Sequence, residues 1–205
     1  MKKIVLCTAL TLLYLVAFAQ GGDVVSRFSK KVSEGRITFS YTYTMEGKIP
    51  VKGSGKAIVQ GDKFLVDGDG SRIICSGSDR WIVDNESKEA ICEKVPTGGT
   101  DLLSNPAALL ARSDDVFHQR KISQDTFKGG NVVSATIRPG GTSAIESLSL
   151  YFSGETPVGL SVVMTSGEKT VFDIDGLKFL PAGDEKEFFF DEKGLSDDWM
   201  VTDLR

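Results

Sequence analysis

Ile-Thr-Phe-Ser-Tyr-Thr-Tyr-Thr-Met, residues 37–45, is the stretch that decides the fold. Apolar and aromatic side chains at the odd positions alternate with hydroxyl side chains at the even positions. Successive side chains of a β-strand point to opposite faces, so this alternation predicts a strand with one buried face and one face in water.

A short helix is predicted directly before this strand, over residues 24–33. Its apolar side chains form a single stripe, and the lysines and arginine lie off that stripe. Asp23 is placed to cap the first turn, and Gly35 is placed to end the helix. The apolar stripe consists of Val24, Val25, Phe28 and Val32.

Further short strands follow at close spacing, with Gly, Asp and Ser supplying the turns between them. Their period-two patterns predict an antiparallel meander of about ten strands, which would curl into a barrel or half-barrel. The expected strands lie near residues 55–60, 63–67, 71–76, 79–84, 89–95, 116–123, 131–138, 145–153, 158–166, 169–175 and 186–191.

Residues 96–112 interrupt the strands with helical signals. Thr100 or Asp101 could start a turn that carries Leu102 and Leu103. Asn105 followed by proline is typical of a helix start, and the apolar residues 107–111 then predict a short helix that ends at Arg112.

The first nineteen residues have the pattern of a bacterial secretory signal peptide. Lys2 and Lys3 precede an apolar run, and Ala17-Phe18-Ala19 forms a small-x-small cleavage site. The run is short for a membrane span, which needs about 20 apolar residues. We therefore expect residues 20–205 to form one mature domain. It should be soluble and unanchored, and located in the periplasm if the cell has an outer membrane.

The composition excludes some partners. The chain has a formal net charge of −4, and loss of Lys2 and Lys3 with the leader makes it more acidic. It has no cluster of lysine and arginine, so nucleic acid and anionic membrane surfaces are poor partners. The hydrophobic content of 40% is ordinary for a folded domain.

Two cysteines remain after cleavage, and the predicted meander keeps them apart. A two-residue turn would pair Cys75 with Arg80, and a four-residue turn would pair Trp81 with Cys92. The thiols would then lie two strands apart, about 10 Å, and on opposite faces. We expect two free thiols.

No residue pattern for catalysis or for a resident metal or cofactor is evident. A histidine-containing triad could be built only around His118, and a lone strand histidine is more typical of a surface. Residues 67–70 resemble the start of a calcium loop, but the twelfth position is Ser78, so a hairpin turn is the better interpretation. Asp173 and Asp175 could share a cation, although a solvated strand face fits them better.

The order of these features resembles the periplasmic outer-membrane lipoprotein carriers, LolA and its relatives. The helix and strand at 23–45 match the opening of that family. Residues 73–84 match a family hairpin, including its glycine, tryptophan and closing aspartate. Residues 104–112 match the lid helix in mid-chain, and the ending 201–205 resembles LolA-like proteins of the Bacteroidetes.

The resemblance implies mainly β structure with short α segments, an incomplete antiparallel β-barrel closed by lid helices. It also implies a monomeric, non-enzymatic carrier. Such a carrier takes acylated lipoproteins from an inner-membrane ABC transporter to an outer-membrane acceptor. Family members commonly hold the lid through an Arg-Pro pair, for which this chain has Gln60-Gly61. A lipid-binding, glycolipid-binding or envelope-sensing module of the same fold is the alternative.

The implied acyl-chain cavity would lie between the sheet and the helices. The same apolar stripes would also fit a closed core. The residues nominated for the sheet wall are Phe39, Tyr41, Tyr43, Phe64, Val66, Trp81, Val83, Leu148, Leu150, Leu160 and Val162. Those nominated for the lid are Phe28, Leu102, Leu103, Leu109 and Leu110.

Overall fold

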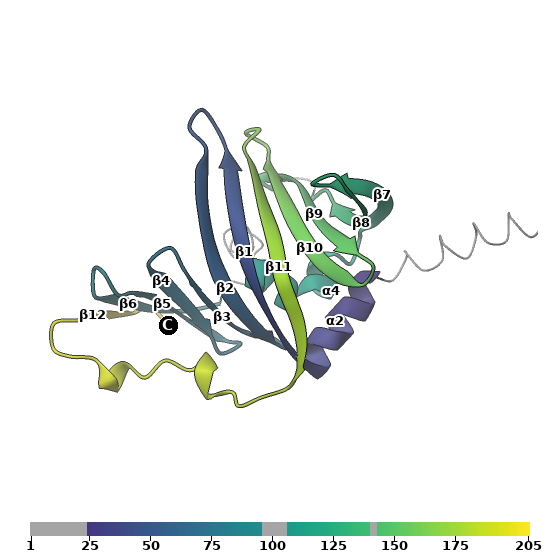
Figure 1. The fold of residues 1–205 in the computed structure, drawn as a ribbon. Coiled ribbons are helices and arrows are strands. Elements are labelled where there is room, and N and C mark those ends of the chain that lie inside the picture. Colours follow the sequence, from purple (N-terminus) through teal and green to yellow (C-terminus); the bar gives the residue numbers. More distant parts are fainter. Residues whose placement is uncertain (1–23, 96–105, 140–142) are drawn as a thin grey trace, which may run out of the picture.

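The computed structural model describes residues 24–95, 106–139 and 143–205, and their strands form one open sheet (Figure 1). The sheet has twelve strands in the order β12-β6-β5-β4-β3-β2-β1-β11-β10-β9-β8-β7, and it does not close into a barrel. The first six strands are β1 (Gly35–Glu46), β2 (Val51–Gln60), β3 (Lys63–Gly68), β4 (Ser71–Cys75), β5 (Asp79–Asp84) and β6 (Glu89–Lys94). The last six are β7 (Lys121–Phe127), β8 (Gly130–Ile137), β9 (Ile145–Ser153), β10 (Thr156–Met164), β11 (Lys169–Pro181) and β12 (Met200–Asp203).

Helices cover one face of this sheet. Among the described residues these are α2 (Val24–Glu34), α3 (Pro106–Ala111) and α4 (Ser113–Val116). Two 3-10 turns, η2 (Lys186–Phe188) and η3 (Glu192–Gly194), belong to the separate C-terminal segment. The apolar stripe of α2 is buried as its spacing predicts, and β1 starts at Gly35 immediately after the helix. The mainly β fold with short helices over an open antiparallel sheet is therefore confirmed.

β1 occupies the centre of the sheet and follows the predicted alternation. It pairs with β2 through Tyr41 and Gly55, and with β11 through Tyr41 and Ile174. Ile37, Phe39 and Tyr41 are buried on the face that the helices cover. The intervening hydroxyl residues point to the opposite face, since neighbouring side chains of a strand alternate.

Two apolar clusters stabilise the molecule, one on each face of the sheet. The first and larger one joins α2, α3 and α4 to β1–β3 and β8–β11. The second lies on the opposite face of β4–β6, where Trp81 and Val83 pack with Phe190, Leu195 and Trp199 of the C-terminal segment.

The C-terminal segment is fastened to the start of β1 by Arg36. Its guanidinium donates to Gln60 Oε1 at 3.0 Å and to the Asp184 carbonyl oxygen at 2.7 Å, and it pairs with Glu187. The ring of Phe188 is fully buried beneath it. Gln60-Gly61 also contacts α2, because the Gly61 N–H donates to the Val32 carbonyl oxygen at 3.2 Å.

Three sequence-based expectations about secondary structure are corrected. Residues 113–116 are helical and β7 starts only at Lys121, so the strand expected over 116–123 is largely wrong. Residues 186–188 form a 3-10 turn rather than part of a strand over 186–191, because Phe188 is buried under Arg36. The meander also gains β12, which pairs in parallel with β6.

The predicted cysteine arrangement is confirmed. Cys75 pairs with Arg80 and Cys92 pairs with Trp81, so the two thiols lie on opposite faces, and both are free and buried. The turn after β3 is a tight one, with positive φ at Asp69 and Gly70, as expected for a hairpin rather than a calcium loop.

Some expectations lie outside the described residues. These are the signal peptide, the Asp23 and Asn105 caps, and the turn carrying Leu102 and Leu103. Among the helices that the structure does describe, none is long and apolar enough to cross a membrane.

Candidate functional site

The nominated acyl-chain residues gather mainly in the apolar layer between sheet and helices. Tyr43 is half-buried and packs against this layer, and eleven other nominated residues are buried within it. Leu102 and Leu103 lie outside the described residues. Whether the layer admits acyl chains stays a prediction. The buried members are Phe28, Phe39, Tyr41, Phe64, Val66, Leu109, Leu110, Leu148, Leu150, Leu160 and Val162.

Trp81 and Val83 do not belong to this layer. Strand register explains why: Phe64 opposes Cys75, which opposes Arg80, so the neighbouring Trp81 points to the other face. The expectation that Trp81 and Val83 share a wall with Phe39 is therefore wrong. They hold the C-terminal segment instead, with the rings of Trp81 and Phe190 4.9 Å apart.

Several further residues complete the apolar layer. Phe152, Phe172 and Ile174 fall on the same period-two pattern as their nominated neighbours, and this pattern could have identified them. Phe117 gave no usable signal, because it ends the short helix α4 where the sequence indicated a strand. The additional buried residues include Val24, Val25, Val32, Ile37, Ala57, Val59, Ala107, Ala108, Phe117, Ala135, Phe152, Phe172 and Ile174.

Aromatic contacts run through the layer from helix to sheet. Phe28 of α2 meets Phe152 of β9 at a centroid distance of 6.0 Å. On the sheet, Phe172 lies between Tyr41 and Tyr43 at 6.1 and 5.7 Å. Offset and edge-on geometries of this kind are the favourable ones for aromatic pairs.

The two tyrosines of β1 carry the polar groups of this layer. Burial, with the nearby Asp69 carboxylate as the second cause, raises the pKa of Tyr41 to about 12. Burial also raises the pKa of Tyr43, whose hydroxyl bonds to Asp69. Both phenols are therefore neutral across the physiological range. Gly55 leaves room for the Tyr41 ring, since a Cβ there would lie 2.6 Å from its hydroxyl oxygen.

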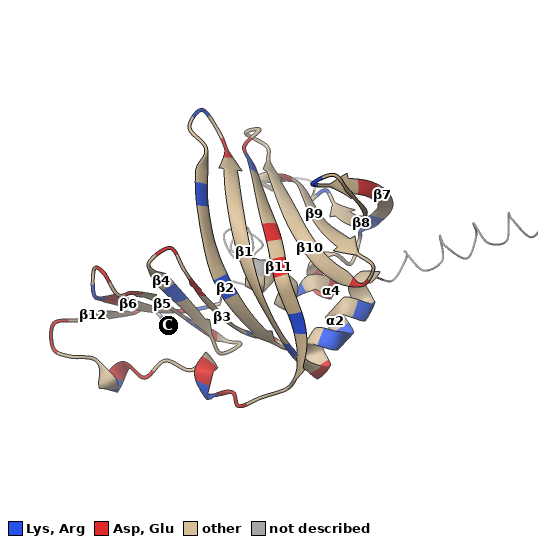
Figure 2. Cartoon of the chain, in the orientation of Figure 1, with Lys and Arg blue, Asp and Glu red and all other residues tan. Residues whose placement is uncertain are grey.

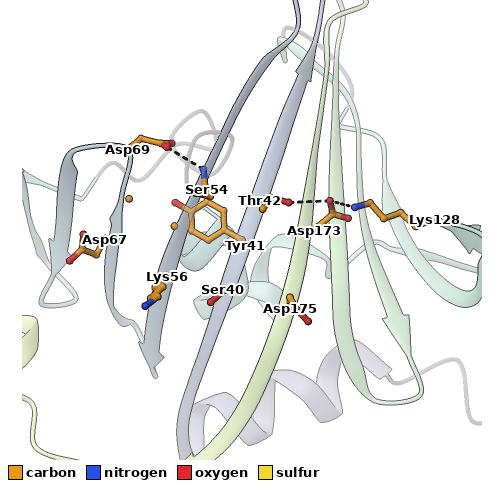
Figure 3. A pocket seen from close by; sticks show the side chains of 12 residues that line it. Ser40, Tyr41, Thr42, Ser54, Lys56, Asp67, Asp69, Lys128, Asp173 and Asp175 are labelled. Carbon is orange, nitrogen blue, oxygen red and sulfur yellow. Dashed lines mark hydrogen bonds and ion pairs between the residues drawn. The ribbon is translucent and has the colours of Figure 1, made fainter.

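A groove of about 790 Å³ lies across β2, β1 and β11 (Figure 3). The β3–β4 turn borders the groove at one end, where Asp69 Oδ1 accepts the Ser54 N–H at 3.2 Å. Lys128 of the β7–β8 turn borders it at the other end. Its lining residues are Ser40, Tyr41, Thr42, Ser54, Gly55, Lys56, Asp67, Gly68, Asp69, Lys128, Asp173 and Asp175.

A second hollow of about 420 Å³ adjoins this groove, and Ser40, Lys56 and Asp67 line both. It adds Thr38, Ile58, Leu65 and Lys178, among others, so the hollowed surface extends along β1. Figure 2 shows the acidic residues of β11 and the basic residues of β2 on these central strands. Charged and hydroxyl side chains line this surface beside apolar ones such as Ile58 and Leu65, whereas the layer under the helices is almost entirely apolar.

The described residues contain no group of three or more His, Cys, Asp or Glu side chains arranged to hold a metal ion. His118 is exposed, and its Nδ1 lies 2.8 Å from the Asp115 carbonyl oxygen. Within the described part of the chain, this backbone contact is the only hydrogen bond of the imidazole.

Comparison with solved structures gives a fold relationship. No protein-family model matches the chain, and no curated protein gives a match. An uncharacterized conserved protein from Thermus thermophilus superposes with a TM-score of 0.57 at 9% identity, covering 88% of this chain and 97% of that one. This likeness concerns the fold alone.

Two other solved structures superpose less closely. A LolA superfamily protein from Nitrosomonas europaea has a TM-score of 0.44 at 12% identity, covering 83% of this chain and 97% of that one. A DUF1329 family protein from Desulfovibrio piger has a TM-score of 0.45 at 12% identity, covering 86% and 98%. A LolA superfamily protein is among the solved structures that resemble this chain in fold.

Proposed function

We propose that the protein is a non-enzymatic periplasmic carrier that shelters acyl chains of lipoproteins between its sheet and its helices. The observation that carries the proposal is the continuous apolar layer that α2, α3 and α4 cover. The chain presents its sheet to the helices almost entirely through aliphatic and aromatic side chains, which are the surfaces that acyl chains require.

The helices that cover the layer are short enough to move. α3 has six residues and α4 has four, well below the about 12 residues at which isolated helices become stable. Ser113 Oγ at the start of α4 is buried without a hydrogen-bond partner, so hydrogen bonding at this turn is incomplete. Displacing α4 would break the exposed hydrogen bond from Ser26 to Asp114, at 2.9 Å, and the ion pair of Asp114 with Arg120.

Energetics favour partial shelter of the cargo. A chain of roughly 15 methylenes at about 0.8 kcal/mol each gains about 12 kcal/mol on leaving water. Two or three such chains would exceed the practical ceiling of about 20 kcal/mol for non-covalent affinity. Opening the helical layer offsets part of this gain, which is what a carrier that must release its cargo needs.

The proposal extends to location and partners. Export by the predicted signal peptide would bring the mature chain to the periplasm. Loading from an inner-membrane ABC transporter and delivery to an outer-membrane acceptor then follow from the LolA resemblance. These partners are part of the proposal.

Binding of fluorescent palmitate to a Leu110 variant tests the function. Leu110 of α3 is fully buried in the layer, so Leu110→Asp would place an unpaired charge against the acyl chain. We expect palmitate affinity to fall by about tenfold or more. Ile49→Asp is the matched control, because Ile49 is 84% exposed.

A filling variant covers the case in which Leu110→Asp does not fold. Leu110→Phe enlarges a buried side chain and should lower palmitate affinity at a folding cost of about 1–3 kcal/mol. Unchanged affinity in a folded Leu110 variant would overturn the carrier proposal. Mass spectrometry of material that co-purifies from the periplasm should find acylated protein. Finding only free lipid or glycolipid would instead favour the alternative module.

A further inference from the structure

The polar groove on the far face of the sheet has an ordered lining. One row across the strands runs Asp67, Lys56, Ser40 and Asp175, since each residue pairs directly with the next. The next row runs Ser54, Thr42 and Asp173. Hydroxyl groups thus occupy the centre, with charged groups on both sides of them.

Several of these groups have no partner within the protein. In the part of the chain that the structure describes, Lys56, Ser40 and Asp175 side chains form no hydrogen bond or ion pair. Asp173 Oδ1 is buried and has no hydrogen-bond partner, while Oδ2 accepts from Thr42 at 3.3 Å and pairs with Lys128 (Figure 3). Asp173 Oδ1 is therefore free to accept a hydrogen bond from a ligand or from water.

We propose that this groove binds a neutral oligosaccharide. Carboxylates can only accept hydrogen bonds and lysines can only donate them, whereas each hydroxyl of a sugar does both. A polyhydroxyl ligand can therefore satisfy Lys56, Ser40 and Asp175 in one row without bringing a charge of its own.

The balance of charge disfavours polyanions and compact cations as ligands. Four aspartates and two lysines line the groove, so a polyanion is repelled by the carboxylate excess. A compact cation would have to sit beside Lys56 and Lys128, and no metal-holding group is present among the described residues. A neutral ligand avoids both penalties.

An aromatic pair lies on the groove face next to the second row, outside the residues that line the groove. Asp173 pairs with Gly159, which pairs with Tyr151, so these three residues lie on the groove face. The ring of Phe127 stacks on Tyr151 at 4.6 Å and 22°. Gly159 is required beneath it, because a Cβ there would lie 2.3 Å from Phe127. The apolar faces of sugar rings pack well on such rings.

The groove and the acyl layer lie on opposite faces of the sheet, so this inference is independent of the carrier proposal. The test is titration of the ¹⁵N-labelled mature protein with three neutral sugars, maltohexaose, cellohexaose and chitohexaose. Hexagalacturonate and spermine serve as anionic and cationic comparisons. We expect at least one neutral sugar to shift the amide signals of groove residues on β1, β2 and β11.

Two variants locate the binding. Lys56→Met and Asp175→Asn should each weaken sugar affinity by about tenfold. Lys52→Met, further along β2, and Glu146→Gln, exposed on β9, should leave it unchanged. Fluorescent palmitate binding should be unaffected in all four variants.

Three results would overturn the proposal. The first is the absence of shifts with all three neutral sugars. The second is binding that Lys56→Met and Asp175→Asn leave intact, and the third is tighter binding of spermine or hexagalacturonate than of any neutral sugar.

Discussion

Phe28 and Phe152 meet edge to face, with ring centroids 6.0 Å apart and ring planes at 69°. Both side chains are fully buried, and they connect α2 at the start of the described chain to β9. The same Phe28 ring also lies 6.3 Å from Phe179 of β11. One side chain thus anchors the helix to two strands of the sheet.

Removing this ring should be costly for folding. We expect Phe28→Ala to lower the free energy of unfolding by about 3–5 kcal/mol, because it leaves a cavity among well-packed aromatic rings. Urea denaturation measures the change. Lys30→Ala on the exposed side of α2 should change the free energy of unfolding by less than about 0.5 kcal/mol. A Lys30→Ala effect as large as that of Phe28→Ala would contradict the anchoring role of the Phe28 ring.

Replacing Arg36 should also lower the free energy of unfolding. Arg36→Met removes the partner of Glu187 and leaves Gln60 Oε1 with one donor fewer. Because Glu187 is about a third exposed, we expect a loss of about 2 kcal/mol rather than the 3–5 kcal/mol of a fully buried pair. Lys186→Met is the control, since Lys186 is almost fully exposed. A change equal to that of the control would show that the segment is held elsewhere.

The two thiols should be free and protected. Cys75 and Cys92 are both buried, and burial raises the pKa of Cys92 above its ordinary value, which lowers its thiolate content. We expect slow alkylation of the native mature protein and two reactive thiols after denaturation without reductant. A count of zero in denaturant would mean a disulfide and a wrong strand register.

Strong acid should release β12 before the rest of the sheet. Arg205 of the C-terminal segment pairs with Asp79 of β5 at 3.4 Å, and hydrogen bonds from Lys94 and Arg205 lower the pKa of Asp79 below its ordinary 3.8. Arg205 also lowers the pKa of Asp203 to about 2. A depressed carboxyl pKa contributes stability above the unfolded value of 3.8, and this stability is lost as pH falls through the folded value. Acidification from about pH 4 toward about pH 2 should therefore weaken the attachment of residues 200–203.

Amide hydrogen exchange of residues 200–203, corrected for the intrinsic pH dependence, measures that release. Asp79→Asn, which removes the β5 partner of Arg205, should show lower protection already near neutral pH and a smaller further loss in acid. Retention of full protection at about pH 2 would contradict the role of these ion pairs. High salt should act in the same direction as acid, because the pairs are exposed and screened.

The sequence predicted the parts of the fold whose signals are local. The alternation at 37–45 specified β1, and the stripe of Val24, Val25, Phe28 and Val32 specified α2. Turn lengths around Gly77 and Asn85 indicated the register of β4, β5 and β6, and hence the separation of the thiols.

The remaining parts depend on contacts distant in sequence. Phe188 lies in a run of aromatic residues that resembles a strand, and its burial under Arg36 has no local signal. All four residues of β12 are exposed, so they carry no periodicity. The face of Trp81 depends on the register between β3 and β4. The polar groove depends on Asp67, Lys56, Ser40 and Asp175 meeting across four strands.

The second apolar cluster gives the protein an optical property. Its two tryptophans are Trp81 and Trp199, and both pack beside the C-terminal segment. The layer under the helices has tyrosines but no tryptophan among its described residues. Tryptophan fluorescence should therefore change when the C-terminal segment detaches and stay unchanged when a ligand enters beneath α3. One emission spectrum would then distinguish events on the two faces of the sheet.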